Sequence, residues 1–438
     1  MSVFVGMSHV GTHEKSKNNP DIVVRRGILR EKISGLMRKK IALEKVMRMV
    51  VKTSHFKEVK MVELLKNRDY INKNLSNCSN ESLSISIGSY NILAQCHLVN
   101  NYFLYENCDQ KYLDWPIRWI NIKKDFENLN CDILCLQEVE IKHYSSDIEP
   151  AMLQLGYKGF LSAKSGAKPD GCAIFVKLDK FDYDQSIFET LLFHRDELSV
   201  LSTHNVGQIA LLSPISNPDS KICVANTHLS FNPNHGEIKL AELSLLLARI
   251  DAVSNAHRVS NRESDSYYIP IILCGDFNSE AKSDIIKFIT NGSFDFNKSL
   301  ASEISGQNEQ AFWGKRNPSL LSMSELPPRL GISDQMIFSE ISTDSSIGTG
   351  LFSHNLKLKS VYEYIGEDKS RLVTSYVNST SCSVDFIFYR NVNCLPRLEL
   401  VSYLNLLNSE EFSRISGIPN EYHGSDHIPI VARFRLII

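Results

Sequence analysis

From residue 85 onward, short apolar runs bounded by polar turns recur along the chain, and this pattern restricts the possible folds more than any other feature of the sequence. Runs of this length are typical of strands buried inside a sheet. Stretches with helical spacing of apolar residues lie between some of them, at Trp115–Leu129, Ile238–Val253 and Ser283–Thr290. The strand-like runs are Ile85–Ile92, Ile133–Leu136, Ala173–Val176, Ile209–Leu212, Ile222–Ala225, Ile269–Cys274, Val384–Tyr389 and Ile428–Phe434.

This alternation of strands and helices predicts an α/β domain in which one sheet packs against another and helices cover the outside. We place this domain at residues 85–438. Three segments, 256–268, 302–328 and 364–382, are polar and poor in strand patterns. We expect them to be surface insertions that lie near the functional site or are mobile.

The N-terminal segment differs from the rest in charge. Residues 1–80 carry 17 Lys and Arg and 7 Asp and Glu, so their net charge is +10 and that of the remaining residues is −12. Apolar spacing predicts a helix over 24–52, and the Asn- and Ser-rich stretch 72–84 indicates a linker. A basic arm over residues 1–84 suits a protein that binds a polyanion, while a solvated tail and a helix packed on the main domain are the alternatives.

The cysteines and the apolar runs indicate the compartment. Ten cysteines form no CxxC pair, and several lie inside apolar runs, which predicts buried free thiols rather than disulfides. No run approaches 18 consecutive apolar residues, and the N-terminus lacks the pattern of a secretory signal. We therefore expect an intracellular protein of the cytoplasm, with the nucleus also open, and no membrane partner.

Polar residues of catalytic type follow the predicted strands. The run Ile269–Cys274 leads into Gly275, Asp276 and Asn278. Asp276 and Asn278 are two apart, so they project from one face of an extended chain. A carboxylate there can orient or deprotonate water, and a neutral amide can donate to a phosphoryl oxygen. Turn formation is the alternative for Asx residues after a strand.

Other strand ends repeat this arrangement. Glu138 follows the run that begins at Ile133 and offers a hard oxygen ligand suited to Mg²⁺. Asn91 and His228 end two further runs. Each alone is equally compatible with a strand-end cap, but five such signals in one chain together supply metal ligands, a water activator and groups that stabilise a phosphoryl transition state.

The last group lies near the C-terminus, where Asp426 and His427 precede a strand. A histidine beside an acid can stabilise a phosphoryl group or orient a substrate. Asp385 lies inside an apolar run, where an unpaired carboxylate would be costly, so we expect His427 as its cationic partner. The chain contains no P-loop, GxSxG, HExxH or paired CxxC motif, which excludes the corresponding nucleotidase, serine hydrolase and zinc classes.

These motifs, in this order, resemble those of the endonuclease/exonuclease/phosphatase superfamily over residues 85–438. Their sequences are most similar to the deadenylase-like branch and, within it, to the angel protein group. This resemblance implies a four-layer αββα sandwich with the site at one edge. It implies that Glu138 binds Mg²⁺, for which Mn²⁺ can substitute, with Asn91 nearby and Asp426 as a second acid on the metal side. The stretches that carry the resemblance are 89–93, 168–174, 196–207, 224–229, 275–278, the Gly331-Ile332-Ser333 neighbourhood and 425–427.

The same resemblance implies five catalytic roles. Asp276 activates the attacking water, and Asn278 supports the phosphoryl transition state. His427, held by Asp385, stabilises developing charge on the phosphate, and His228 contacts the scissile phosphate. These roles agree with those inferred above from residue type and strand position.

One departure from the deadenylase pattern concerns substrate choice. Deadenylases that stack adenine usually carry an aromatic residue five positions before the strand aspartate, and here that position is Thr380. The resemblance implies a hydrolase acting at RNA 3′ ends, either as a 2′,3′-cyclic phosphatase or as a 3′–5′ exoribonuclease, and Thr380 favours the first. It also implies mRNA-decay or translation factors as partners of the arm. The rival interpretation is a catalytically weak RNA- or translation-factor-binding protein with the same fold.

Overall fold

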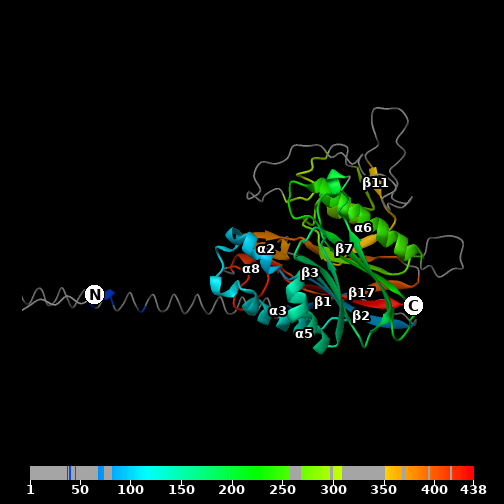
Figure 1. Cartoon of the computed structure of the whole chain (residues 1–438), viewed down its shortest axis with the longest axis horizontal. Coiled ribbons are helices and arrows are strands. Elements are labelled where there is room, and N and C mark those ends of the chain that lie inside the picture. Colours follow the sequence, from blue (N-terminus) through cyan, green and yellow to red (C-terminus); the bar gives the residue numbers. More distant parts are fainter. Residues whose placement is uncertain are drawn as a thin grey trace, which may run out of the picture. The chain divides into compact units, whose positions relative to one another are not determined.

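The computed structural model describes residues 37, 39, 40, 45, 68–73 and 81–438, except 197, 257–267, 296–298, 308–350, 367–369, 393–394 and 415–416 (Figure 1). Nearly all of the predicted helix over 24–52, most of the insertions 256–268 and 302–328, and the 331–333 stretch lie outside the described residues. Within the described part of the chain, none of the helices combines the length and the apolar character needed to cross a membrane.

Two mixed sheets form the centre of the structure. All neighbouring strands in both sheets run antiparallel except β2 with β3 and β8 with β9, which are parallel. The first sheet has the order β1 (Tyr70–Asn72), β17 (Arg397–Leu404), β19 (Ile430–Ile437), β2 (Ser82–Asn91), β3 (Ile133–Glu140), β5 (Asp170–Lys177) and β4 (Tyr157–Ala163). The second has the order β12 (Leu358–Ser360), β16 (Asp385–Arg390), β9 (Ile271–Asp276), β8 (Ile222–His228), β7 (Val206–Pro214) and β6 (Phe181–Leu192).

Helices and smaller strand pairs complete the architecture. Figure 1 shows α6 on one side of the paired sheets and α3 and α5 on the other. Three two-stranded ribbons pair β10 (Ser293–Asp295) with β11 (Leu351–Ser353), β13 (Leu372–Val373) with β18 (Leu407–Asn408), and β14 (Ser375–Val377) with β15 (Thr380–Cys382). The helices are α2 (Gln95–Asn100), α3 (Trp115–Leu129), α4 (Ile141–His143), α5 (Glu149–Gln154), α6 (Gly236–Ala256), α7 (Asp284–Asn291) and α8 (Ser409–Ser413), and shorter helical turns span Tyr102–Tyr105, Gln110–Tyr112, Tyr144–Ile148 and Ser199–Leu201.

The alternation of side chains along β3 shows why this arrangement forms. Ile133 and Cys135 belong to the main core between the two sheets, whereas Leu134 and Leu136 belong to a second core that also contains Phe126 of α3. Since successive strand residues point to opposite faces, an uninterrupted apolar run is stable only where both faces are covered. The predicted four-layer α/β sandwich is confirmed.

The predicted strands and helices are confirmed to within a few residues, and the prediction for Trp115–Leu129 coincides with α3. Five strands of the two main sheets were missed: the three-residue strands β1 and β12, and β4, β6 and β17. β4 and β6 are edge strands, and β17 is covered on its outer side only by the three-residue β1. Such strands expose one side and therefore carry polar residues such as Asp182 and Glu399 in place of a continuous apolar run.

Two predicted polar segments contain regular structure. The segment 364–382 was expected to be poor in strands, but it holds β13, β14 and β15. The linker over 72–84 contains the end of β1 and the start of β2. Arg68, just before β1, donates to the carbonyl oxygens of Asn405 (3.2 Å) and Pro429 (2.5 Å). The sheet therefore begins before residue 85, and residues 70–72 form part of it.

A group of buried amides joins the two sheets below their common edge. Gln137 of β3 donates from Nε2 to Oδ1 of Asn226 on β8 (2.7 Å). Asn226 Nδ2 in turn donates to the carbonyl oxygen of Leu136 (3.0 Å) and to Oε1 of Gln208 on β7 (3.0 Å). All three amide side chains are fully buried. Because a buried polar group is costly without its partner, these bonds favour one alignment of the sheets.

Arg118 of α3 holds the chain that follows β2. Its guanidinium is buried and donates to the carbonyl oxygens of Ile92 (3.1 Å), Leu93 (2.8 Å) and Gly424 (2.8 Å), and to Oε1 of Gln95 (2.9 and 3.2 Å). Burial lowers the pKa of Arg118 to about 10, so the group stays charged at neutral pH. The arginine thus fixes two segments that are far apart in the sequence.

We expect Arg118→Leu to lower the free energy of unfolding by about 3 kcal/mol or more, because three carbonyl oxygens lose their donor inside the protein. Urea denaturation followed by circular dichroism measures this change. Lys123→Leu on the same helix is the control, since its exposed ion pair with Glu127 spans 4.0 Å and contributes at most about 1 kcal/mol. Equal stability of the wild-type and Arg118→Leu proteins would contradict the role assigned to this arginine.

Candidate active site

The strand topology brings the predicted site residues to one edge of the sandwich. Asn91 ends β2 and Glu138 lies near the end of its parallel neighbour β3. His228 and Asp276 end the parallel strands β8 and β9 and are register partners. Asp385 begins β16, which is antiparallel to β9, so it lies directly across from Asp276. Since parallel strands end at the same side of a sheet, both sheets present their polar residues at this edge.

At Gly275, the residue before Asp276, the backbones of β9 and β8 approach closely. Gly275 has φ +152°, and a Cβ placed on it would lie 2.2 Å from the carbonyl oxygen of Thr227 on β8. Only glycine fits this space without displacing backbone, which explains the residue that the sequence places before the aspartate.

Glu138 is held in its ionised form. Its Oε1 accepts from Nδ2 of Asn91 (3.1 Å), and its Oε2 accepts from the backbone N–H of Ala94 (3.0 Å) and lies 2.9 Å from Nδ1 of His97. Burial by itself would raise the pKa of Glu138, but the neighbouring charge of His97 and its hydrogen bond hold that pKa well below its ordinary value. An ionised, buried carboxylate is a suitable ligand for a hard divalent cation.

Asn91 orients two carboxylates at once. Its Nδ2 donates to Glu138 and also to Oδ2 of Asp276 (3.0 Å), while its Oδ1 accepts from the N–H of Leu93 (3.0 Å). The amide oxygen is therefore engaged by the backbone. Asn91 thus fixes the directions of Glu138 and Asp276, and its place among the metal-side residues stays a prediction.

Asp276 is poised to exchange a proton near neutral pH. Its Oδ1 accepts from the N–H of Asn278 (2.9 Å). Burial, and then the negative charge of Asp385, raise its pKa to about 7. A general base works best when its pKa lies near the working pH, so the environment of Asp276 suits the activation of water.

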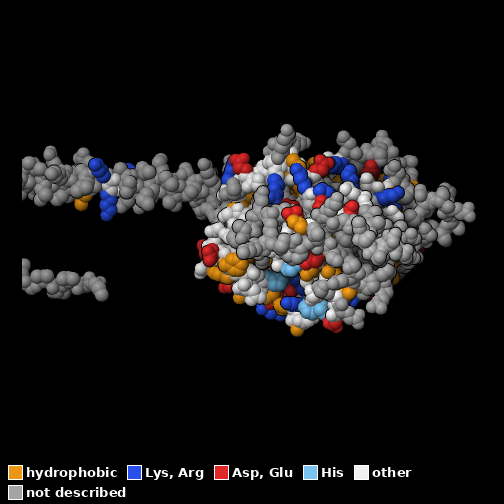
Figure 2. All heavy atoms as spheres, turned by 90° about the horizontal axis from the view of Figure 1, so that it is seen from above, with side chains coloured by type: hydrophobic (Ala, Val, Ile, Leu, Met, Phe, Trp, Pro, Cys, Tyr) orange, Lys and Arg blue, Asp and Glu red, His pale blue; other side chains and the backbone are white. Residues whose placement is uncertain are grey.

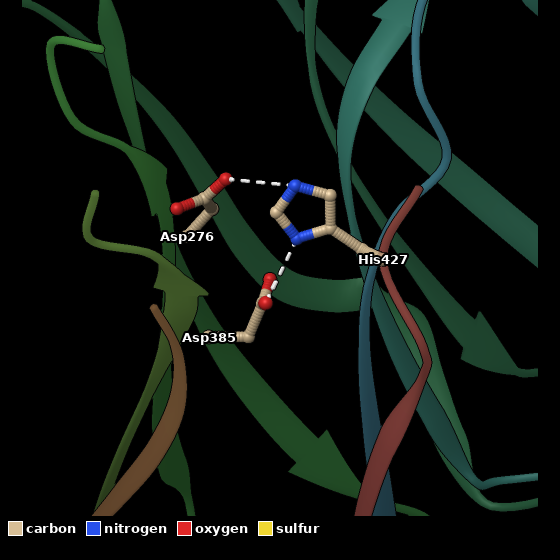
Figure 3. Close-up of side chains that lie close together, drawn as sticks. All are labelled: Asp276, Asp385 and His427. Carbon is tan, nitrogen blue, oxygen red and sulfur yellow. Dashed lines mark hydrogen bonds and ion pairs between the residues drawn. The ribbon is translucent and has the colours of Figure 1, made fainter. Parts of the chain in front are cut away.

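His427 and Asp385 form the predicted pair, shown in Figure 3. Nδ1 of His427 lies 2.8 Å from Oδ2 of Asp385, and its Nε2 lies 3.7 Å from Oδ2 of Asp276. Burial alone would lower the pKa of His427, but the negative charge of Asp385 raises it well above the ordinary value. The ring therefore carries a positive charge that faces Asp276.

These three side chains bring possible metal ligands within 4.8 Å of one another. A hydrogen bond of 2.8 Å between His427 and Asp385 requires a proton on Nδ1, and a positively charged ring has no lone pair to offer a metal. The arrangement is thus that of an aspartate–imidazolium pair beside a second carboxylate. Cation binding is better suited to the neighbouring Glu138 and Asp426.

His228 and Asn278 are joined by a hydrogen bond that fixes both. Nδ2 of Asn278 donates to the carbonyl oxygen of Leu229 (3.0 Å) and to Nε2 of His228 (2.9 Å). Burial lowers the pKa of His228 to about 3, so its ring is neutral. Nε2 therefore accepts and Nδ1 carries the proton. Both hydrogens of the Asn278 amide are engaged, so the free donor toward a phosphoryl group is Nδ1 of His228 and not the amide that the sequence suggested.

Asp426 lies on the same side as Glu138. Its Oδ2 accepts from the hydroxyl of Tyr105 (2.8 Å), and its Oδ1 lies 4.0 Å from Nε2 of His427. Burial raises the pKa of Asp426, the positive charge of His427 opposes this rise, and the negative charge of Glu138 adds to it. A cation between these two carboxylates would relieve their repulsion.

Sequence reasoning missed Tyr105, His97 and the Lys164–Asp170 ion pair. Lys164 Nζ lies 2.7 Å from Asp170 Oδ2, and His97 Nε2 lies 3.4 Å from Asp170 Oδ1. The two histidine contacts join Asp170 to Glu138 through His97. The sequence analysis named Asp170 only as part of the 168–174 stretch. The feature that could have marked it as a site residue is an acidic side chain next to a glycine.

The site opens into a cavity of about 510 Å³. This volume lies in the range of pockets that bind small ligands. Thr380 and three neighbours from the β14–β15 ribbon form one wall. The predicted residues in the lining are Glu138, His228, Asp276, Asn278, Asp426 and His427, and Asn91 and Asp385 lie behind them.

The fold and this set of residues define a class of protein. The model of the endonuclease/exonuclease/phosphatase family matches residues 88–427, and the chain belongs to this family. It is 36% identical over 378 residues to protein angel homolog 2 of Danio rerio, which covers 80% of this chain and 64% of that protein. It is 27% identical over 372 residues to the CCR4-Not complex 3′–5′-exoribonuclease subunit Ccr4 of Kluyveromyces lactis, which covers 81% of this chain and 41% of that protein.

A solved structure is similar over a larger share of its length. It is described as ANGEL2, a 2′,3′-cyclic phosphatase, in complex with adenosine-2′,3′-vanadate. The sequences are 35% identical, the TM-score is 0.73, and the match covers 85% of this chain and 99% of that chain. The chain thus spans less than two thirds of the two full-length relatives named above but nearly all of this structure.

We expect Asp385→Asn to lower the pKa of His427 toward 6.5, because burial is then opposed only by the weaker effects of Asp426 and Asp276. The imidazolium form is favoured in the folded wild type. Its contribution to stability is thus complete below pH 6.5 and is lost as the pH rises through the folded-state pKa. A pH titration of the histidine ring signals by NMR measures the shift.

His354 is the internal control for this titration. Burial lowers its pKa to about 4, and its ring contacts the carbonyl oxygen of Phe288 rather than a carboxylate. An unchanged His427 titration beside an unchanged His354 would show that Asp385 does not hold the charge on the ring.

Proposed function

We propose that this protein is a divalent-metal-dependent hydrolase that removes 2′,3′-cyclic phosphates from RNA 3′ ends. The observation that carries the proposal is the site itself. An aspartate with a pKa of about 7 lies 3.7 Å from an imidazolium, and both line a cavity together with an ionised glutamate. Similarity to a solved 2′,3′-cyclic phosphatase over 85% of the chain supports the substrate.

The donor set fits a hard cation such as Mg²⁺, with Mn²⁺ as a substitute. Glu138 and Asp426 would hold it, and Asn91 would fix the direction of Glu138. Burial is the main cause of the raised pKa of Asp426, and the charge of Glu138 adds to it; a divalent ion would stabilise the ionised forms of both carboxylates. A bound cation supplies neutralisation of charge on the phosphoryl oxygens.

Asp276 accounts for the proton balance, because the proton that it takes from water in each step returns to the ribose oxygen that leaves. Asp276 accepts a proton from the water that attacks phosphorus, and the imidazolium of His427 stabilises the negative charge that develops on the phosphoryl oxygens. Nδ1 of His228 donates to the same group, and Asn278 keeps that ring in its donor form. One water opens the cyclic ester by breaking one P–O bond, and a second releases inorganic phosphate.

Thr380 favours a cyclic phosphate over a poly(A) tail. It lies in the cavity wall, so the position that could stack a base carries a small polar side chain. Without an aromatic ring there, the affinity for a base falls by about 1–3 kcal/mol. A cyclic end can be recognised mainly through its reacting phosphate. Selective shortening of poly(A) requires recognition of the adenine base.

We expect the purified protein with Mg²⁺ to convert RNA ending in a 2′,3′-cyclic phosphate to RNA with a free terminal diol and inorganic phosphate, and to shorten oligo(A) far more slowly. Product analysis on defined RNA 3′ ends measures both. Asp276→Asn should lower kcat by about 100-fold or more, because the general base is removed. Asp284→Asn, which changes an exposed acid on α7, is the matched control.

Two outcomes would overturn the proposal. Shortened oligo(A) beside an intact cyclic end would assign exonuclease activity instead. Absence of turnover on both RNAs with Mg²⁺ and with Mn²⁺ would favour the rival interpretation of a binding protein. The ionised Glu138 and the intact His427–Asp385 pair argue against that rival, since a protein under no catalytic demand gains nothing from so many buried charges.

RNA attraction is assigned to the N-terminal arm as a second part of the proposal. On the face shown in Figure 2, the described basic and acidic side chains are interspersed and form no broad basic field. The net charge of +10 over residues 1–80 would supply the positive charge that attracts RNA. The other part of this prediction is that the same arm binds mRNA-decay or translation factors.

We expect deletion of residues 1–60 to weaken RNA binding and to flatten its dependence on salt, by a slope of about 0.7 for each phosphate that the arm neutralises in the full-length protein. Fluorescence anisotropy at several salt concentrations measures both. The cut at 60 leaves Arg68 and β1 in the sheet. Equal affinity and equal slope in the truncated protein would mean that the arm does not hold RNA.

A further inference from the structure

Lys239 lies beneath the site, in the first turns of α6, and the assigned chemistry does not use it. Its side chain is fully buried. Lysine is rarely found in such a place, because removing an ammonium from water is costly. The hydrogen bonds of its Nζ to described residues go to neutral oxygens, and burial lowers its pKa to about 7.

The ammonium has two neutral acceptors. Nζ donates to the backbone carbonyl oxygen of Asn278 (2.5 Å) and to Oε1 of Gln307 (2.8 Å). The first contact joins the lysine to a site residue. Gln307 also lies in the lining of the cavity, so both acceptors belong to the wall of the site.

Asn278 needs such a donor because its backbone is unusual. Its φ is +45°, in the left-handed region that non-glycine residues seldom occupy. This conformation turns its carbonyl into the protein, where an unpaired oxygen would be costly. Its N–H is bound by Oδ1 of Asp276 and its carbonyl by Lys239, so the peptide groups on both sides of Asn278 are fixed.

The orientation of Asn278 determines that of His228. The Asn278 amide donates to Nε2 of His228, which leaves the proton on Nδ1. Nδ1 is buried, has no hydrogen-bond partner among the described residues, and lies 4.0 Å from Oε1 of Glu138. It is therefore a donor without a partner in the described part of the protein, on a residue that lines the cavity.

We propose that Lys239 is a positioning residue that acts through Asn278 to keep His228 in the tautomer whose Nδ1–H faces the substrate. This inference rests on the proposed phosphoesterase function for its effect on rate, but its effect on the histidine ring is independent of turnover. The competing interpretation is that Lys239 only fills space and joins α6 to the segment around Gln307.

Lys239→Met is the main test, because it keeps the length of the side chain and removes the donor and the charge. We expect kcat on RNA ending in a cyclic phosphate to fall by about 10–100-fold with KM changed less than about threefold, since a misplaced catalytic group costs rate more than binding. Lys239→Arg keeps a donor and should recover part of kcat. Ser244→Ala on the same helix is the control, because its hydroxyl bonds only to the carbonyl of Leu240.

The structural readout is the tautomer of His228, observed through its ring nitrogens by NMR. We expect the Nδ1–H form in the wild type and in Ser244→Ala, and a mixture of tautomers in Lys239→Met. Should Lys239→Met unfold, Lys239→Gln, which keeps a shorter donor, is measured in the same way.

The outcomes separate the two proposals. A wild-type protein without turnover refutes the proposed function, while a changed tautomer in Lys239→Met still supports the positioning role. An unchanged tautomer together with an unchanged kcat in that variant overturns the role of Lys239. Equal decreases of kcat in Lys239→Met and Lys239→Arg with an unchanged tautomer show that the lysine only packs.

Discussion

The gathering of buried carboxylates at one edge of the sandwich is the constraint on which the rest of the site depends. Glu138, Asp276, Asp385 and Asp426 come from four segments, and little water reaches any of them. Their mutual repulsion in a medium of low dielectric must be offset by nearby cations or by protonation. The structure uses both, since His97 keeps Glu138 ionised while Asp276 has a pKa of about 7.

This separation of neighbouring pKa values fits the proposed division of roles. Groups whose environments drive their pKa values apart can act as acid, base and ligand at one pH. The imidazolium of His427 exists because Asp385 lies beside it, and its charge in turn lowers the pKa of Asp276 from what burial alone would give. Removing any one member therefore changes the others, so single substitutions here are not expected to add.

Much of this could be predicted from the sequence, for a physical reason. Apolar runs fix where strands begin and end, and pairing of parallel strands then brings the residues after them together. The pairing of His427 with Asp385 followed from the cost of an isolated buried acid. Contacts between distant side chains were not accessible in this way: Tyr105 and Asp426 are 321 positions apart, and neither residue type by itself indicates the other.

The direction of a side chain was the second limit. Asn278 was placed correctly at the end of β9, but its amide hydrogens bind Leu229 and His228 instead of facing the cavity. The segment 364–382 was read as polar surface, yet Ser375 pairs with His427 and Tyr376 donates its N–H to the carbonyl oxygen of Asp426 (2.9 Å). The cavity wall that carries Thr380 is thus joined by backbone bonds to the segment that carries His427.

The buried amides of Gln137, Asn226 and Gln208 have a consequence for how this fold can vary. Glu138 belongs to one sheet and Asp276 to the other, and apolar contact alone would let the two layers slide by small steps at little cost. Hydrogen bonds between the amides are directional and form only at particular offsets of the two sheets, so small shifts between the sheets are disfavoured. Loops around the edge can therefore be exchanged between relatives while the spacing across the edge is preserved, whereas a chimaera that takes one sheet from each parent must inherit the three amides as a unit.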